Sequence, residues 1–288
     1  MENKLEHRGR FYVVGTGPAG PQMATLQALA VLKKMDAVVA SDEHLQLFKE
    51  YVGGKPVLFD PWEGFWDDNG KKIADLSEEE AVEFHAKRFA LRDERVHIIK
   101  EHLRQGKDVA LLDSGNPCFF GPGHWYVEQF AEQEIVIIPG MGCEAAALAL
   151  LGKSIIPAHE TGFVLQTAPQ FLPEPDKIFR DLPQFPVSTV MYMIFRDHEK
   201  IFASLKKVYP AETPCAVVYW AGYPDKQHVI RGTVVDMASK IAEEKENEAG
   251  LLFVGRFLDG KPYEAAMQKS ARAAHRSNNF SSLPRIGK

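Results

Sequence analysis

The sequence predicts an α/β protein that is built from two α/β domains. Short apolar runs alternate with helical segments in the first half, which is typical of a parallel sheet with helices on its faces. After a stretch rich in proline, a second series of such runs and helices follows. We place the boundary at the proline–glycine break near residue 139, so that the domains cover residues 11–139 and 140–260. A basic, loosely held tail is expected over residues 261–288.

The composition of the 288 residues is that of a globular protein, with 45% hydrophobic and 25% charged residues. No run of about 18 apolar residues is present, and the charged N-terminus lacks the apolar core of a signal peptide. Three widely spaced cysteines without a C-x-x-C pair indicate a reducing compartment and argue against a metal site. A net charge of −5 does not favour nucleic acid as a partner. We therefore expect a cytoplasmic protein with no membrane, nucleic-acid or metal partner.

The first half contains a regular succession of expected elements. The segment 24–35 is apolar nearly all round, which predicts a helix buried on every side. Ser77 and Glu80 form a capping box that predicts the start of a long helix, and Gly106 suits the position after its end. One face of this helix carries five apolar residues: Val82, Phe89, Val96, Ile99 and Leu103. The expected strands cover residues 11–14, 37–40, 56–59, 109–112 and 134–138, and the expected helices cover residues 24–35, 77–105 and 124–132.

The second half is less regular. Helices are expected over residues 144–151, 199–208 and 235–246, and β-type runs over residues 163–165, 189–194, 216–220 and 251–254. One irregular segment belongs to the first half, where Trp62, Phe65 and Trp66 stand among acids and glycines. Two interpretations of this segment stay open, a lid over a flat substrate ring or a small satellite core beneath a long loop.

A loop of four residues, Ser114-Gly115-Asn116-Pro117, ends the apolar run 109–112. The run has the length of a strand that is buried on both faces. In open α/β sheets, ligands bind just outside the carboxyl ends of the strands. The sequence therefore predicts that this loop forms the floor of a ligand site.

The loop Gly15-x-Gly17-x-x-Gly20 matches the dinucleotide fingerprint, because it follows a predicted strand and opens a predicted helix. Asp42 ends the second strand where a ribose-binding acid belongs. However, Pro18 and Pro21 flank the third glycine and remove backbone N–H groups that a pyrophosphate needs. A nicotinamide-dependent oxidoreductase is therefore kept as an alternative function.

Five segments, in the same order along the chain, resemble the tetrapyrrole (corrin/porphyrin) methylases, a family of S-adenosylmethionine (SAM)-dependent methyltransferases. The SGNP loop resembles the GDP loop of that family. The other segments are VVGTGPAGPQMATLQALAVLKKMDAVVASD, VIIPGMGCEAAALALLG, TVMYM and TPCAVVYWAGYPDKQHVIRGTVVDM. The second half is most similar to enzymes that methylate C11 of precorrin-4 in cobalamin synthesis. The resemblance thus implies methylation of a corrin or porphyrin precursor.

The resemblance also implies a fold with two α/β domains and SAM in the cleft between them, a homodimer, and S-adenosylhomocysteine as product. Met193 is expected to present its backbone to the adenine, while Asn116 and Phe119 lie against the methionine part. The implied cofactor residues are Gly17, Pro18, Asn116, Phe119, Gly142, Cys143, Met193, Ala221, Gly232 and Thr233. Because the donor is already activated, no general base is expected. Candidates for contact with the substrate carboxylates are His124, Arg180, Arg196 and Arg231.

Two residues depart from the family pattern. Asn116 stands where the family has an acid, so a negative charge that favours a sulfonium or ammonium group is lost. Gly142 stands where a small hydroxyl residue is usual. Some peptide methyltransferases of the same superfamily also replace the acid. Two further alternatives therefore stay open, methylation of a peptide or other non-tetrapyrrole acceptor, and SAM binding without catalysis.

Overall fold

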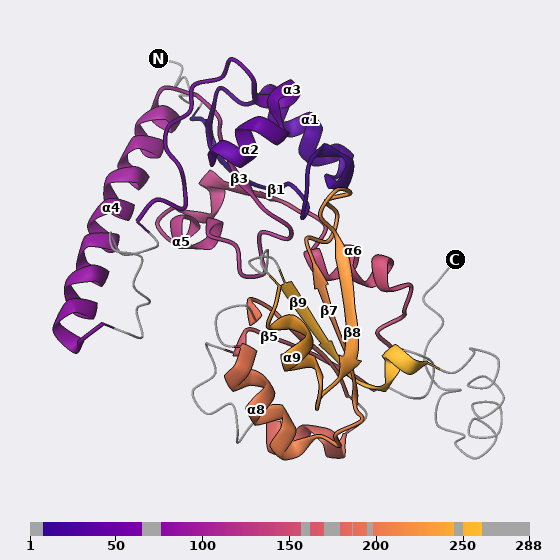
Figure 1. Ribbon diagram of the computed structural model, residues 1–288. Helices are drawn as coiled ribbons and strands as arrows, with labels where there is room; N and C mark the ends of the chain where they lie inside the picture. The colour runs from indigo at the N-terminus through magenta and orange to yellow at the C-terminus, as the bar shows by residue number, and fades with distance from the viewer. Residues whose placement is uncertain are drawn as a thin grey trace, which may run out of the picture. The chain divides into compact units, whose positions relative to one another are not determined.

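The computed structural model describes residues 8–64, 76–156, 162–169, 179–185, 187–194, 198–244 and 250–260 (Figure 1). The chain divides into two compact units, of which the first ends at Cys143 and the second begins at Glu144. Phe65, Trp66, Arg196 and the tail 261–288 lie outside the described residues. In the part of the chain that is described, no helix combines the length and the apolar composition needed to cross a membrane.

The first unit is built on a parallel sheet of four strands in the order β2-β3-β1-β4, which agrees with the parallel sheet expected from the sequence. Residues 56–59, an expected strand, form only one parallel bridge, between Val57 and Val38. The elements in chain order are β1 (Phe11–Gly15), α1 (Leu26–Lys34), β2 (Ala37–Val39), α2 (Asp42–Leu47), α3 (Lys49–Val52), α4 (Glu78–Arg104), β3 (Val109–Asp113), α5 (Gly123–Val127), β4 (Ile135–Ile138) and α6 (Cys143–Leu151), the last beginning where the two units divide.

Helices cover both faces of this sheet, because successive side chains of a strand point to opposite sides. Leu112 of β3 packs with α1 and the α2–α3 region on one face, whereas Leu111 packs with α4 and α5 on the other. In Figure 1, α1 to α3 and α4 accordingly lie on opposite sides of β1 and β3. The predicted all-round burial of the first helix is wrong. Leu26 is 85% exposed, because only the stripe of α1 that faces the sheet is covered.

Helix α4 begins with the predicted capping box, in which Ser77 Oγ accepts from Glu80 N and Ser77 N donates to Glu80 Oε2. The predicted apolar face is buried only in its second half, since Val82 and Phe89 are 65% and 48% exposed. The reason is length. A helix of 27 residues is about 40 Å long, whereas a strand of 5 residues spans only about 17 Å. The first half of α4 therefore extends past the sheet.

The second unit contains a mixed sheet in the order β5-β6-β9-β7-β8. Strands β5 and β6 are parallel, whereas β9 is antiparallel to both β6 and β7, and β8 is antiparallel to β7. Its elements are β5 (Phe163–Thr167), β6 (Val187–Met191), α8 (His198–Val208), β7 (Pro214–Tyr219), β8 (His228–Thr233), α9 (Met237–Ile241) and β9 (Gly250–Val254). Strand β8 was not predicted, because Arg231 and Gly232 interrupt its apolar pattern.

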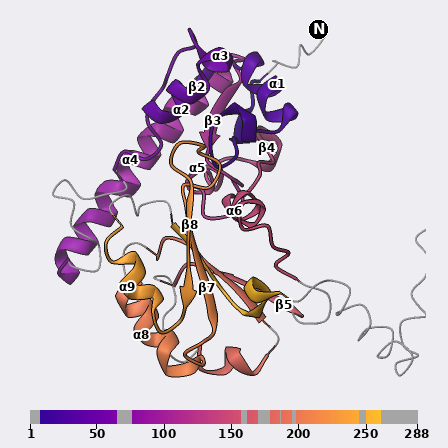
Figure 2. The ribbon, with the colours of Figure 1, turned by 45° about the vertical axis from the view of Figure 1, so that its right-hand side comes forward.

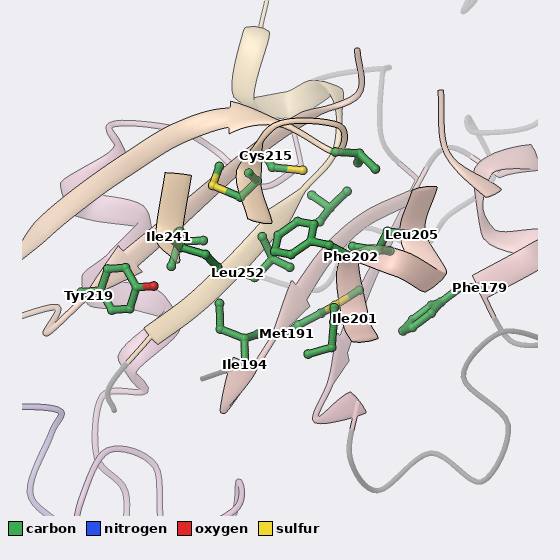
Figure 3. Packing of buried hydrophobic residues seen from close by; sticks show 14 residues of the cluster. Phe179, Met191, Ile194, Ile201, Phe202, Leu205, Cys215, Tyr219, Ile241 and Leu252 are labelled. Carbon is green, nitrogen blue, oxygen red and sulfur yellow. The ribbon is translucent and has the colours of Figure 1, made fainter. Parts of the chain in front are cut away.

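The core of the second unit lies between this sheet and helices α8 and α9, which lie together beside it (Figure 2). Phe202 of α8 is fully buried among side chains of β6, β7 and β9 (Figure 3). Met191 and Leu252 contribute from the sheet, and Ile241 contributes from α9. This packing fixes the strands, and with them the loops that follow β6 and β7.

Candidate functional site

Loops from three strands meet at the carboxyl edge of the first sheet. Strands β3, β1 and β4 are adjacent and parallel, so their carboxyl ends lie at one edge. The loop after β1 and the loop after β3 form a bridge, in which Gly115 N donates to Gly17 O over 2.8 Å. The predicted ligand-site floor is thus held directly against the loop of Gly17 and Pro18.

The backbones of these loops approach so closely that only glycine fits at positions 15 and 140. A Cβ on Gly140 would lie 2.1 Å from Gly115 O, and a Cβ on Gly15 would lie 2.4 Å from Gly140 N. A Cβ on Gly115 would lie 4.0 Å from Gly142 Cα and 3.9 Å from Cys143 N. The structure therefore brings the predicted residues Gly142 and Cys143 next to the loop that carries Asn116.

Asn116 accepts two hydrogen bonds from other residues of the loop after β3. Its Oδ1 accepts from Cys118 N over 3.0 Å, and its carbonyl accepts from Phe119 N over 3.0 Å. The next residue, Phe120, has a φ of 60°, and its ring lies 4.7 Å from that of Phe119 in an edge-to-face arrangement. A side chain with positive φ is strained, and such strain is concentrated at functional sites.

The glycine loop differs from a dinucleotide fingerprint in one decisive respect. The turn Pro21–Met23 separates Gly20 from helix α1, which begins only at Leu26 with Thr25 as its N-cap. Asp42 is an exposed residue in the first turn of α2. The expectation that this loop opens the helix is wrong, and a pyrophosphate bound there would not meet a helix N-terminus. This geometry weakens the nicotinamide alternative.

Asp113, the last residue of β3, is a fully buried acid that sequence reasoning did not select. Its Oδ2 accepts from Gly123 N over 3.0 Å, while Oδ1 has no hydrogen-bond partner among the described residues. A Cβ on Gly121 would lie 2.4 Å from Oδ2, so the loop encloses the carboxyl closely. Burial raises the pKa of Asp113 to about 7, although the hydrogen bond from Gly123 opposes this shift. An acid at the end of an apolar run, directly before the loop, was the available sequence signal.

His44, at the start of α2, is a second buried polar residue that was not predicted. Its Nδ1 lies 3.0 Å from Ser41 Oγ, and its Nε2 lies 3.1 Å from Ser114 Oγ and 3.4 Å from Thr16 Oγ1. Burial lowers the pKa of His44, although the carboxylates of Glu43 and Asp60 oppose this shift. One neutral imidazole therefore connects the segments that follow β1, β2 and β3.

In the second unit, Met193 and Ala221 follow the carboxyl ends of β6 and β7. Both strands are antiparallel to β9, so they point in the same direction and end at the same edge of their sheet. Met193 has a φ of 55°, and Trp220, directly before Ala221, has a φ of 51°. Together with Phe120, these are the non-glycine residues with positive φ in the described part of the chain. All of them lie on loops that follow the strands β3, β6 and β7.

Gly232 and Thr233 lie at the opposite edge of the second sheet. They pair with Cys215 and Pro214 at the start of β7, whereas Ala221 follows the end of this strand. Thr233 N and Oγ1 donate to Asp236 Oδ1 over 2.7 and 3.1 Å and close the turn into α9. The structure does not bring these two residues together with Met193 and Ala221, because they end an antiparallel strand, and their assignment to the adenine stays a prediction.

Comparison with protein families identifies the chain. A family model described as Tetrapyrrole (Corrin/Porphyrin) Methylases matches residues 10–238. The chain belongs to the tetrapyrrole methylases. The resemblance read from the sequence is confirmed, as is the prediction of an enzyme from a SAM-dependent methyltransferase family.

Several tetrapyrrole methylases are similar to this chain over most of its length. The cobalt-precorrin-4 C(11)-methyltransferase of Methanocaldococcus jannaschii is 24% identical over 265 residues, which are 90% of this chain and 92% of the relative. The precorrin-4 C(11)-methyltransferase of Pseudomonas aeruginosa is 26% identical over 272 residues, which are 92% and 96% of the two chains.

Solved structures of tetrapyrrole methylases share the fold. A cobalt precorrin-4 methyltransferase from cobalamin biosynthesis has a TM-score of 0.67 at 22% identity, covering 87% of this chain and 96% of its own. A uroporphyrin-III C-methyltransferase from Thermus thermophilus, complexed with S-adenosyl homocysteine, has a TM-score of 0.61 at 19% identity, covering 87% and 99%. The predicted fold class, two α/β domains of the tetrapyrrole methylase type, is confirmed.

The candidates for contact with a tetrapyrrole are separated by the structure. His124 is exposed at the start of α5, directly after the loop that carries Asn116 and Phe119. Arg231 is exposed near the far end of β8, where its guanidinium donates to Leu151 O over 3.2 Å. Arg180 precedes the amino end of β6, whereas Met193 follows the carboxyl end of that strand. Of these three described candidates, only His124 adjoins a loop at a carboxyl edge.

Proposed function

We propose that this tetrapyrrole methylase transfers a methyl group from SAM to a carbon of a corrin precursor of the precorrin-4 type. The observation that carries the proposal is the meeting of three glycine loops at the carboxyl edge of the first sheet. The similarity to two precorrin-4 C(11)-methyltransferases over about 90% of the chain supports the choice of acceptor. Cytoplasmic location and homodimeric assembly, expected from the sequence, belong to the same proposal.

The residues that the structure describes fit SAM in each unit. In the first unit, Gly15 and Gly140 allow the loops to approach closely, and Asn116 adds an uncharged polar side chain beside them. In the second unit, Met193 and Trp220 hold strained backbone conformations on the loops after β6 and β7. We assign the adenine to these loops, since an adenine ring needs backbone donors and acceptors together with apolar surroundings.

The proposed mechanism assigns binding and orientation to the chain. SAM, when bound, supplies an activated methyl group on a positively charged sulfur. The glycine loops and Asn116 hold the amino-acid end, while the loops of Met193 and Ala221 hold the adenine. Fixing two reactants in the geometry of attack accounts for a large part of such a rate enhancement. Since the methyl donor is already activated, this mechanism assigns no residue as a strong base.

Isothermal titration calorimetry with purified protein tests the cofactor. We expect S-adenosylhomocysteine and SAM to bind, and NADH to give no heat. Tight binding of NADH without a response to either sulfur compound would overturn the proposal and restore the oxidoreductase alternative. Turnover with methyl-labelled SAM and a mixture of corrin precursors then tests the acceptor. Binding of SAM without label transfer to tetrapyrroles would favour a non-catalytic or peptide-directed relative.

Asn116→Asp tests the placement of the loop after β3. The carboxylate keeps the hydrogen bond from Cys118 N, so the melting temperature is expected to change little. The restored negative charge should strengthen the binding of SAM by about fivefold to tenfold, and that of uncharged-sulfur S-adenosylhomocysteine by less. Asn116→Ala is the control that adds no charge and removes the acceptor of the hydrogen bond from Cys118 N. Equal affinities of Asn116→Asp and the unmodified protein for SAM would contradict this placement.

A further inference from the structure

His44 occupies a buried position between three hydroxyl groups. The residue is 6% exposed, and its backbone N–H donates to Ser41 Oγ, which caps helix α2. Its two ring nitrogens face different segments, with Ser41 Oγ at 3.0 Å from Nδ1, and Ser114 Oγ and Thr16 Oγ1 at 3.1 and 3.4 Å from Nε2. Ser114 and Thr16 belong to the loops that follow β3 and β1.

The hydrogen bonds around this imidazole determine where its proton lies. The Thr16 hydroxyl donates to Asp113 O over 2.9 Å, so Thr16 Oγ1 faces the ring with its lone pairs. We assign the hydrogen to Nε2, where Ser114 Oγ and Thr16 Oγ1 can share it, so that Nδ1 accepts from the Ser41 hydroxyl. Burial favours the neutral ring, which has one donor and one acceptor nitrogen.

This arrangement fixes the direction of the Ser114 hydroxyl. Its oxygen accepts from His44 Nε2–H, so its own proton points away from the imidazole. Ser114 is exposed and immediately precedes Gly115 and Asn116 at the carboxyl edge of the sheet. An oriented hydroxyl proton at such an edge is a donor for an anionic group, and hydrogen bonds to charged acceptors are stronger than those to neutral ones.

We infer that His44 is a positioning residue that holds the Ser114 hydroxyl as a donor toward the carboxylate of the bound amino-acid end of SAM. The inference rests on the proposed function, because it specifies how the protein recognises the carboxylate of SAM. Neither residue contributes to the chemistry of transfer. The Ser41 hydroxyl donates to His44 Nδ1 and so keeps the ring in one orientation.

The test compares two ligands in a set of variants by calorimetry. The ligands are S-adenosylhomocysteine and its decarboxylated analogue, which differ only in the carboxylate. In the unmodified protein, S-adenosylhomocysteine is expected to bind at least about tenfold more tightly. Ser114→Ala and His44→Asn should each reduce this ratio to within about threefold of one, since Asn reaches only the Nδ1 position. His44→Gln, which places an amide donor near the Nε2 position, should keep most of the ratio.

The outcomes separate this inference from the proposed function. If neither ligand binds the unmodified protein, the proposed function fails. If S-adenosylhomocysteine binds and the ratio is unchanged in Ser114→Ala or in a folded His44→Asn variant, the positioning role is wrong. Melting curves show whether the buried His44 variants fold. If they do not, the ratio in Ser114→Ala, a substitution at an exposed position, still tests whether the Ser114 hydroxyl binds the carboxylate.

Discussion

Gly140→Ala is expected to weaken the binding of S-adenosylhomocysteine and to destabilise the fold. The new Cβ would lie 2.1 Å from Gly115 O and 2.6 Å from Gly15 C, so backbone atoms of two other loops would have to move. Neither contact is with the end of a flexible side chain. Overpacking of this kind lowers the free energy of unfolding by roughly 1–3 kcal/mol or more. The same displacement of the loops should weaken the binding of S-adenosylhomocysteine by about tenfold or more. Calorimetry and urea unfolding measure the two effects.

Gly20→Ala is the matched control, because Gly20 is also a buried glycine and lies in the loop after β1, which is one of the three converging loops. The nearest atom to its Cβ would be Gln22 Oε1 at 3.0 Å, which belongs to a flexible side chain that can turn away. We expect nearly unchanged affinity and stability for this variant. If Gly140→Ala behaved like Gly20→Ala, the close approach of the three loops would be wrong.

Asp113→Asn is expected to stabilise the protein at neutral and alkaline pH. The folded-state pKa of Asp113 is about 7, raised from an ordinary value of 3.8, so folding favours the protonated form. The stability that comes from this preference is complete below about pH 4 and is lost as the pH rises to about 7. A shift of this size corresponds to roughly 4 kcal/mol, and the asparagine variant does not lose it.

Urea unfolding of Asp113→Asn and the unmodified protein at about pH 5 and about pH 8 measures the effect. The difference in the free energy of unfolding should grow in favour of the variant by roughly 3 kcal/mol between these conditions. Asp42→Asn, at an exposed acid of the same unit, should show no such growth. A difference that stays constant with pH would mean that Asp113 is ionised in the fold without cost.

Local sequence patterns predicted most elements, since a capping box or an apolar run is decided by residues that are close along the chain. The convergence of the loops near Gly17, Asn116 and Gly142 was also predictable, because parallel strands end at a common edge. Asp113 and His44 were missed because their environment is made by distant residues. The bond between His44 and Ser114 spans 70 positions, and no periodicity reveals such a contact.

The second unit shows where local patterns fail. A run of apolar residues gives no strand direction, and a mixed sheet reverses direction at the turn between β7 and β8. The sequence around Gly232 and Thr233 therefore did not reveal that these residues lie at the opposite end of the sheet from Met193 and Ala221. The predicted burial of the whole apolar face of α4 was wrong for a similar reason, because the apolar pattern does not show how far the sheet extends beneath the helix.

The three strained corners at Phe120, Met193 and Trp220 have a consequence for the engineering of a more stable variant. Each side chain makes its corner less stable by about 1–2 kcal/mol, a penalty that glycine would avoid. A chain selected for thermal robustness alone would converge on glycine at all three places. Glycine would, however, also remove the ring contacts that Phe120 makes with Phe119 and that Trp220 makes with Tyr223.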